Sequence, residues 1–355
     1  MGGSWTPGTK EIIPGIYTNF TEAAIAAITG GQRGVVAIPV FKYTGTAKSG
    51  KFYTIETVDD AKEILGADNA KAVELILAGG AKSALVYAVP AAPLEGSLDY
   101  DAMLEAFTTQ EFNVFVYPDA QTTEVEDKTK AWVINCREKE GKHFLYIAGG
   151  TAADDATPTK GNARSVRLAD DYVTNLITGI ISNGVEIYSG KLAPHIAGII
   201  AATAINKSIT YKQITAEDVN KRLKRSEIET ALTSGSLVLV FDGVKVKIVQ
   251  GIVTKSNEAK RGKIRAIRAR QAIVTDISKT VEDNYIGKID NNADGQAALI
   301  SAVKAYLEVL EGENVLSEAT VELNPKYASV GDSVYLLIGY LEVDSMEHVY
   351  LTIKA

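Results

Sequence analysis

The side chains that most often carry catalysis are few in this chain and lie far apart. Its three histidines, His143, His195 and His348, match no metal-ligand spacing. No serine stands in a Gly-x-Ser-x-Gly elbow, and no Gly-x-x-x-x-Gly-Lys-Ser/Thr phosphate loop is present. These patterns favour a protein without a catalytic site, a metal or a cofactor.

Other groups admit a chemical interpretation beside a structural one. Asp154-Asp155 before Thr157-Pro158 could suggest a metal, but a solvated loop is the better interpretation. His195 follows a proline at the start of an apolar segment, which indicates a helix-start or interface residue. Paired glycines at 30–31, 79–80 and 149–150 could cradle phosphate, yet none opens a strand–helix fingerprint, so we expect turns.

Composition limits the class of protein further. The 355 residues are 46% hydrophobic, enough for two or three domains. The single cysteine, Cys136, excludes a disulfide within the chain and reads as a small buried hydrophobe. The N-terminal residues predict no secretory signal. The longest apolar run, Ile196 to Ile205, is about half the length a membrane span needs, so we expect a buried helix and no membrane span.

A basic segment stands out against an acidic chain. Residues 255–270 carry seven Lys and Arg residues against one glutamate, a local charge of +6 where the whole chain has a net charge of -7. Nucleic-acid binding would need interleaved aromatic residues for stacking, and residues 254–280 have none. Two interpretations stay open: a solvated strand face, or a surface for an acidic protein partner.

Hydrophobic periodicity predicts how the elements are arranged. From Arg33 to Pro90 two short strands, two helices and a further strand form a small α/β unit, with Thr57 as a helix N-cap. From Pro93 to about Thr233 strands and helices alternate, which indicates a parallel or mixed sheet covered by helices. After Gly235 we expect a hairpin turning at Asp242-Gly243, a basic strand at 263–268, two helices and three final strands, the last at 347–354.

Several of these segments, taken in order, resemble one family. They are a hairpin ending in Gln250-Gly-Ile-Val-Thr254, the basic strand Lys263-Ile-Arg-Ala-Ile-Arg268, and Val281-Glu-Asp-Asn-Tyr-Ile-Gly-Lys-Ile-Asp-Asn291. Gly34 to Pro39 and Gly79 to Val89 agree with the opening domain of the same family. The chain is similar to contractile-tail sheath proteins of bacteriophages and of phage-tail-like bacteriocins.

The resemblance implies a multidomain fold of α/β and α+β class. An N-terminal extended arm would occupy residues 1–20, a small N-terminal α/β domain 21–92, a subtilisin-like sheath domain without a catalytic triad 93–233, and a C-terminal α+β domain with a terminal linking strand 234–355. A hydrolase on a subtilisin-like or related α/β fold is the alternative, and the scattered histidines disfavour it.

A function and partners follow from the same resemblance. The chain would be a structural subunit, not an enzyme, that polymerises around an inner tail-tube protein and contracts to drive the tube through the host envelope. Baseplate and tail-terminator proteins would be further partners, and nucleic acid would not. The protein would assemble in the bacterial cytoplasm and reside in a virion tail or a bacteriocin particle.

Specific residues carry these expectations. Both chain ends are expected to pair with neighbouring subunits as added strands. The inter-subunit residues would be Thr9, Glu11, Ile12, Ile13, Ile16, Tyr17, Val349, Tyr350, Leu351 and Ile353. The basic segment is expected to face the tube through Lys263, Arg265, Arg268 and Arg270.

Overall fold

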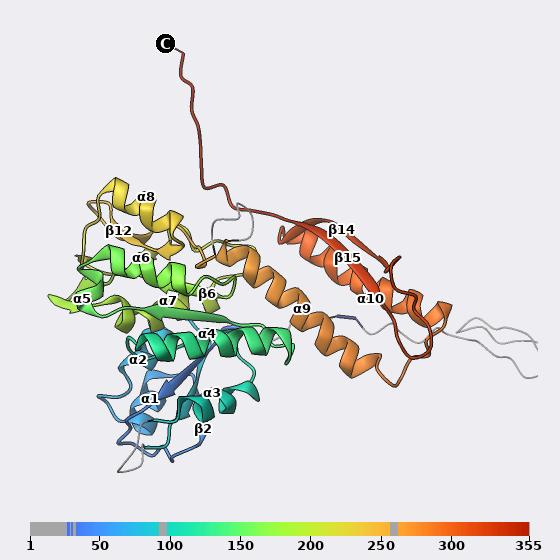
Figure 1. Ribbon diagram of the computed structural model, residues 1–355, viewed down its shortest axis with the longest axis horizontal. Helices are drawn as coiled ribbons and strands as arrows, with labels where there is room; N and C mark the ends of the chain where they lie inside the picture. The colour runs from blue at the N-terminus through green and yellow to red at the C-terminus, as the bar shows by residue number, and fades with distance from the viewer. Residues whose placement is uncertain (1–26, 29, 31–32, 92–97, 256–261, 355) are drawn as a thin grey trace, which may run out of the picture.

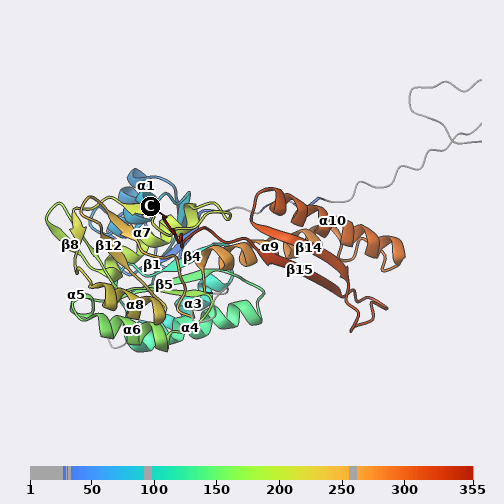
Figure 2. The ribbon, with the colours of Figure 1, turned by 90° about the horizontal axis from the view of Figure 1, so that it is seen from above.

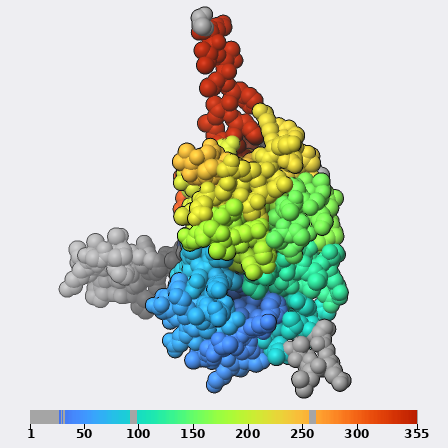
Figure 3. Space-filling model, turned by 90° about the vertical axis from the view of Figure 1, so that its left-hand side faces the viewer, coloured from blue at the N-terminus to red at the C-terminus, as the bar shows by residue number. Residues whose placement is uncertain are grey.

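The chain folds into an α/β body with an elongated C-terminal unit beside it (Figure 1). The computed structural model describes residues 27–28, 30, 33–91, 98–255 and 262–354. The body contains the elements from β1 to β13, the C-terminal unit those from α9 to β15. Residues 348–354 form an extended segment, here named the C-terminal arm, which leads away from both (Figures 1 and 3).

The body is built on a seven-stranded sheet in the order β11-β6-β5-β4-β1-β3-β2. Only the edge strand β2 runs antiparallel to its neighbour. The inner strands are almost wholly buried, as parallel strands covered on both faces are. The strands are Val35–Val40 (β1), Phe52–Ile55 (β2), Ser83–Ala88 (β3), Val114–Val116 (β4), Leu145–Gly149 (β5), Val173–Leu176 (β6) and Ser236–Leu237 (β11).

Helices cover both faces of this sheet (Figure 2). The apolar helix α7 packs across β1, β4, β5 and β6 and against α2, whereas α4 and α6 contact β5 and β6. The helices of the body are Val58–Leu65 (α1), Lys71–Ala78 (α2), Tyr100–Thr108 (α3), Thr123–Glu138 (α4), Ala152–Asp155 (α5), Pro158–Arg167 (α6), Ser189–Ala202 (α7) and Arg225–Thr233 (α8).

Two three-stranded sheets complete the body, in the orders β10-β7-β8 and β12-β13-β9. The hairpin expected at Asp242-Gly243 is confirmed. Gly243 has φ +98°, and Asp242 Oδ1 accepts hydrogen bonds from the backbone N–H groups of Val244 and Lys245 at 3.0 and 2.9 Å. These strands are Ile180–Ser182 (β7), Val185–Ile187 (β8), Gln213–Ile214 (β9), Asp218–Val219 (β10), Leu239–Phe241 (β12) and Val246–Ile248 (β13).

The C-terminal unit consists of two long helices and a two-stranded antiparallel sheet. Its elements are Ile264–Asn284 (α9), Ala293–Gly312 (α10), Leu316–Leu323 (β14) and Leu336–Glu342 (β15). Helix α10 packs on β14. Helix α9 joins the two cores, because Ile264 and Ile267 belong to the core of the body and Ala272 and Ile273 to that of the C-terminal unit.

The structure confirms the mixed α/β class and most of the predicted elements of the body. The expected basic strand at 263–268 is wrong, since residues 264–284 form one helix. One sheet includes strands from both predicted ranges 21–92 and 93–233, and β9 pairs with β13 across the predicted boundary at 233. Strand pairing therefore joins segments that the predicted domain boundaries separate. The subtilisin-like assignment stays a prediction.

Candidate assembly surface

One buried constellation in the body has residue types associated with hydrolysis. At the start of α7, the Ser189 hydroxyl donates to Asp155 Oδ1 at 2.5 Å, and its backbone N–H donates to Oδ2 at 2.7 Å. Asn220 Nδ2 donates to the same carboxylate at 2.7 Å. Burial raises the pKa of Asp155 to about 6, against the opposing effect of these hydrogen bonds.

This cluster connects elements and exposes no nucleophile. Ser189 and Asp155 are both buried, and the serine bonds the carboxylate directly with no histidine between them. The expectation of a solvated loop at Asp154-Asp155 is wrong for Asp155, because α5 folds its side chain beneath the N-terminus of α7. Sequence reasoning missed the pair because Ser189 and Asp155 are 34 residues apart.

The histidines do not form a site. His143 Nδ1 lies 3.0 Å from the Tyr172 hydroxyl, while His195 Nδ1 lies 3.1 Å from the Leu75 carbonyl oxygen. Burial lowers the pKa of both. His348 begins the exposed C-terminal arm. Cys136 is buried, as expected.

The described ranges also hold no larger grouping of metal ligands. Among them, no three His, Cys, Asp or Glu side chains come together in a way that could bind a metal ion. No helix in these ranges has the length and apolar character needed to cross a membrane.

The four basic residues expected to face a tube are engaged within the chain. Arg265 donates to the Ser345 hydroxyl at 2.9 Å and to the Asn314 carbonyl at 2.8 Å, and Arg268 donates to the Thr203 and Ala204 carbonyls. Both are buried, and burial lowers the pKa of Arg268 to about 10.

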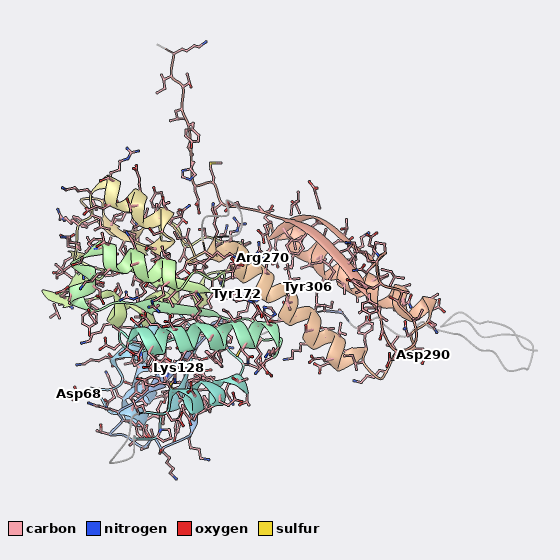
Figure 4. All side chains as sticks on the ribbon, in the orientation of Figure 1. Asp68, Lys128, Tyr172, Arg270, Asp290 and Tyr306 are labelled. Atoms are coloured by element: carbon pink, nitrogen blue, oxygen red, sulfur yellow. The ribbon has the colours of Figure 1, made fainter. Side chains whose placement is uncertain are left out.

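Arg265 and Arg268 therefore do not form a free basic face, contrary to expectation. A helix turns successive side chains by about 100°, so part of the segment faces inward where a strand would alternate. The other two form ion pairs at the surface: Lys263 with Asp344 and Arg270 with Glu342, each at 2.5 Å (Figure 4 labels Arg270).

The C-terminal arm is the most exposed apolar segment that the structure describes. The exposed fractions are 66% for Val349, 92% for Tyr350, 80% for Leu351 and 85% for Ile353. Residues 347–354 form no strand within the single chain. The other expected inter-subunit segment, Thr9 to Tyr17, lies outside the described residues.

The nearest sheet of the C-terminal unit is also open. β14 and β15 pair only with each other, so each has one edge without a strand partner in the described chain. An extended segment and a sheet with free edges are complementary structures, because each has backbone N–H and C=O groups to satisfy. The exposed arm and the open sheet edges make this end of the chain a candidate assembly surface.

Comparison with known proteins identifies the family of the chain. Residues 95–254 match the model of the phage tail sheath protein central domain, and residues 256–355 match that of the phage tail sheath C-terminal domain. The tail sheath protein of Clostridium phage phiCD119 is 24% identical over 371 residues, covering 96% of this chain and 98% of the relative. The uncharacterized protein YqbK of Bacillus subtilis is 21% identical, covering 99% of each chain.

Solved structures with the same fold cover nearly the whole chain. The contracted helical sheath of the anti-feeding prophage has a TM-score of 0.75 at 15% identity and covers 98% of this chain and 99% of that one. The sheath tail protein of Desulfitobacterium hafniense has a TM-score of 0.71 at 17% identity, covering 92% and 100%. The chain belongs to the phage tail sheath protein family and is a structural subunit of a contractile sheath.

Proposed function

We propose that copies of this chain polymerise around an inner tail tube and are held together by their terminal segments. The observation that carries the proposal is the C-terminal arm, whose four large apolar side chains are exposed in the single chain. Fully burying a Val, Leu or Ile side chain contributes about 1.5–3 kcal/mol. A neighbouring subunit that covers the arm would therefore gain substantial binding free energy.

The length and composition of the arm suit strand addition. It has seven residues from His348 to Lys354, the same number as β15. Val349, Leu351 and Ile353 alternate with Tyr350, Thr352 and Lys354, so that an added strand would present one apolar face. We propose that the arm pairs with an open edge of the β14–β15 sheet of a neighbour, and that residues 9–17 link subunits in the same way.

Contraction, in this proposal, moves subunits as rigid bodies. The anti-feeding prophage sheath and the sheath of an extracellular contractile injection system were both observed in contracted states. In the present chain α9 contributes to both cores, which favours joint motion of the body and the C-terminal unit. The arms and the subunit interfaces would then be the parts that rearrange when the lattice passes from the extended to the contracted state.

Further partners complete the proposed function. The sheath would contact an inner tube, a baseplate and a tail terminator, would assemble in the bacterial cytoplasm, and would drive the tube through the host envelope. Lys263 and Arg270 keep part of their side chains exposed, 18% and 25%, and are the members of the basic set available to an acidic tube surface.

We further propose that the chain has no catalytic site. The Ser189–Asp155 pair is buried and lacks a histidine, and the histidines of the body bond to Tyr172 and Leu75 instead. The hydrolase alternative would need an exposed nucleophile with a base beside it. Replacing His195 by Ala should leave assembly and contraction intact in folded particles.

Deletion of residues 348–355 tests the linking role. The truncated chain should be folded and monomeric, because the arm contributes nothing to either core. A full-length variant with Val349, Leu351 and Ile353 changed to Ser should also fail to polymerise. Its control, with Thr352 and Lys354 changed to Ser, should polymerise. Negative-stain microscopy distinguishes the outcomes, and tubes of normal length from the truncated chain would refute the proposal.

A further inference from the structure

One carboxylate is buried within an otherwise exposed stretch at the base of the arm. The side chain of Glu347 is 5% exposed, while Met346 before it is 87% exposed and Val349 after it 66%. Glutamate is rarely buried unless it is paired. The groups that form hydrogen bonds and an ion pair with its carboxylate therefore indicate why this side chain is buried.

Glu347 is held by three separate segments of the chain. Thr210 Oγ1, from the loop between α7 and β9, donates to Oε1 at 2.8 Å. Gln250 Nε2, just after β13, donates to Oε2 at 2.8 Å. Lys263 Nζ, at the start of α9, forms an ion pair with Oε2 at 3.0 Å. Both carboxylate oxygens thus have partners from the body or from α9.

Residues that precede Glu347 also contact basic side chains at the start of α9. Glu342 pairs with Arg270, Asp344 with Lys263, and Ser345 accepts a hydrogen bond from Arg265. Three of the basic residues of this segment are therefore directed at residues 342–347. No such contact is present for residues 348–354 in the described chain.

We propose that Glu347 is the positioning residue of the C-terminal arm, which it anchors to the body so that the flexible link begins at His348. The inference rests on the proposed linking function of the arm. Anchoring makes the free segment begin at His348, and its seven described residues, 348–354, span roughly 23 Å when extended. A shorter tether keeps its end at a higher effective concentration near one site on a neighbour.

The two acidic partners of Lys263 differ in a way that predicts their contributions. Glu347 is buried and accepts further hydrogen bonds from Gln250, Thr210 and Ser208, whereas the side chain of Asp344 is 52% exposed. Exposed ion pairs contribute little, while loss of one partner from a buried set leaves donors unsatisfied. Glu347→Gln should increase the mobility of the base of the arm, and Asp344→Asn should increase that mobility far less.

Spin labels on the unassembled full-length chain, isolated by size-exclusion chromatography, measure the anchor directly. A cysteine replacing Met346 lies before the proposed link, and one replacing Leu351 lies within the arm. Cys136 is buried, so labelling should be confined to the introduced cysteine. Position 346 should show a correlation time roughly threefold or more longer than position 351.

The variants then decide the question. Glu347→Gln should bring the mobility of position 346 to that of position 351, while Asp344→Asn should leave the difference in place. Thr210→Val serves as a second variant should Glu347→Gln fold poorly, and it should give part of the same release. Equal mobility at both positions in the parent chain, or no change in Glu347→Gln, would overturn the anchor. Since the chain is unassembled, this result is independent of whether the arm links subunits.

Discussion

The α/β body buries its apolar side chains within one chain, whereas the C-terminal end of the chain exposes several of them. In the body, strands of the central sheet are buried on both faces by helices of the same chain. The C-terminal unit has a sheet of two strands, and the arm beyond it exposes Val349, Tyr350, Leu351 and Ile353. The body thus buries its apolar side chains within one chain, whereas the C-terminal end exposes those that, in our proposal, a neighbour covers.

Two buried glutamates, one in the body and one at the base of the arm, have pKa values that are shifted in opposite directions. Glu126 lies inside the body with Arg164 and Arg167 beside it, and burial still raises its pKa. Burial also opposes ionisation of Glu347, but hydrogen bonds from Gln250, Thr210 and Lys263 outweigh it and lower its pKa. The first carboxylate connects α4 to α6 within a core, and the second lies at the junction between core and arm.

The largest expected effect is on the body. Phe107 is fully buried, and its ring centroid lies 5.2 Å from those of Phe52 and Phe115. Phe107→Ala should lower the free energy of unfolding by about 3–5 kcal/mol, because it removes buried area and leaves a cavity. Urea unfolding followed by circular dichroism measures the loss. If deleting residues 348–355 lowered the free energy of unfolding by the same amount, the proposed difference between body and arm would be wrong.

Lowering the pH should weaken the contacts of Glu347 and so free the base of the arm. The pKa of Glu347 is lower in the folded chain than in the unfolded one, so its contribution is present above the ordinary glutamate value of about 4.3. That contribution is lost as the pH falls through the lower folded value. A spin label at position 346 should therefore become mobile in acid while the body remains folded.

The charged groups around Glu347 set the control for this titration. Lys263, Asp344 and Arg265 surround it, and the basic pair stays protonated throughout the range. Glu347→Gln should abolish the acid step in label mobility. A step of the same size in that variant would show that Glu347 does not cause the transition.

The smallest expected effect is at a helix cap. Thr57 Oγ1 accepts a hydrogen bond from the Asp60 backbone N–H at 3.1 Å at the start of α1. Thr57→Ala should cost about 1 kcal/mol of stability. Thermal unfolding measures it, and polymerisation should be unchanged. A polymerisation defect without a stability loss would place α1 at a subunit interface.

Local patterns predicted most of the body. The N-cap at Thr57 and the Asp242-Gly243 turn each depend on residues close in sequence. The order of the motifs also predicted the family, which no single motif could specify. Helix α6, in contrast, was not predicted, because its sequence is polar and has few apolar residues to reveal a helical pattern.

Long-range contacts account for what was mispredicted. Residues 263–266 alternate basic and apolar side chains, as a half-buried strand does, but the segment forms the start of α9. Arg265 and Arg268 are buried there because carbonyl oxygens of Asn314, Thr203 and Ala204 accept their hydrogen bonds. The partners of Glu347 are likewise distant in sequence, because Thr210 and Gln250 precede it by 137 and 97 residues. No local pattern marks such partners.

Disulfide trapping in assembled particles tests the central claim most directly. A cysteine at Leu351 would be combined with one at Leu337 or at Leu341 on β15, and Cys136 stays buried and unreactive. Cross-strand neighbours lie close enough for a disulfide, so at least one pair should link subunits into covalent chains after oxidation. The same pairs should give no covalent multimers in the unassembled chain. Well-formed tubes with no intermolecular disulfide from either pair would contradict strand exchange through β15.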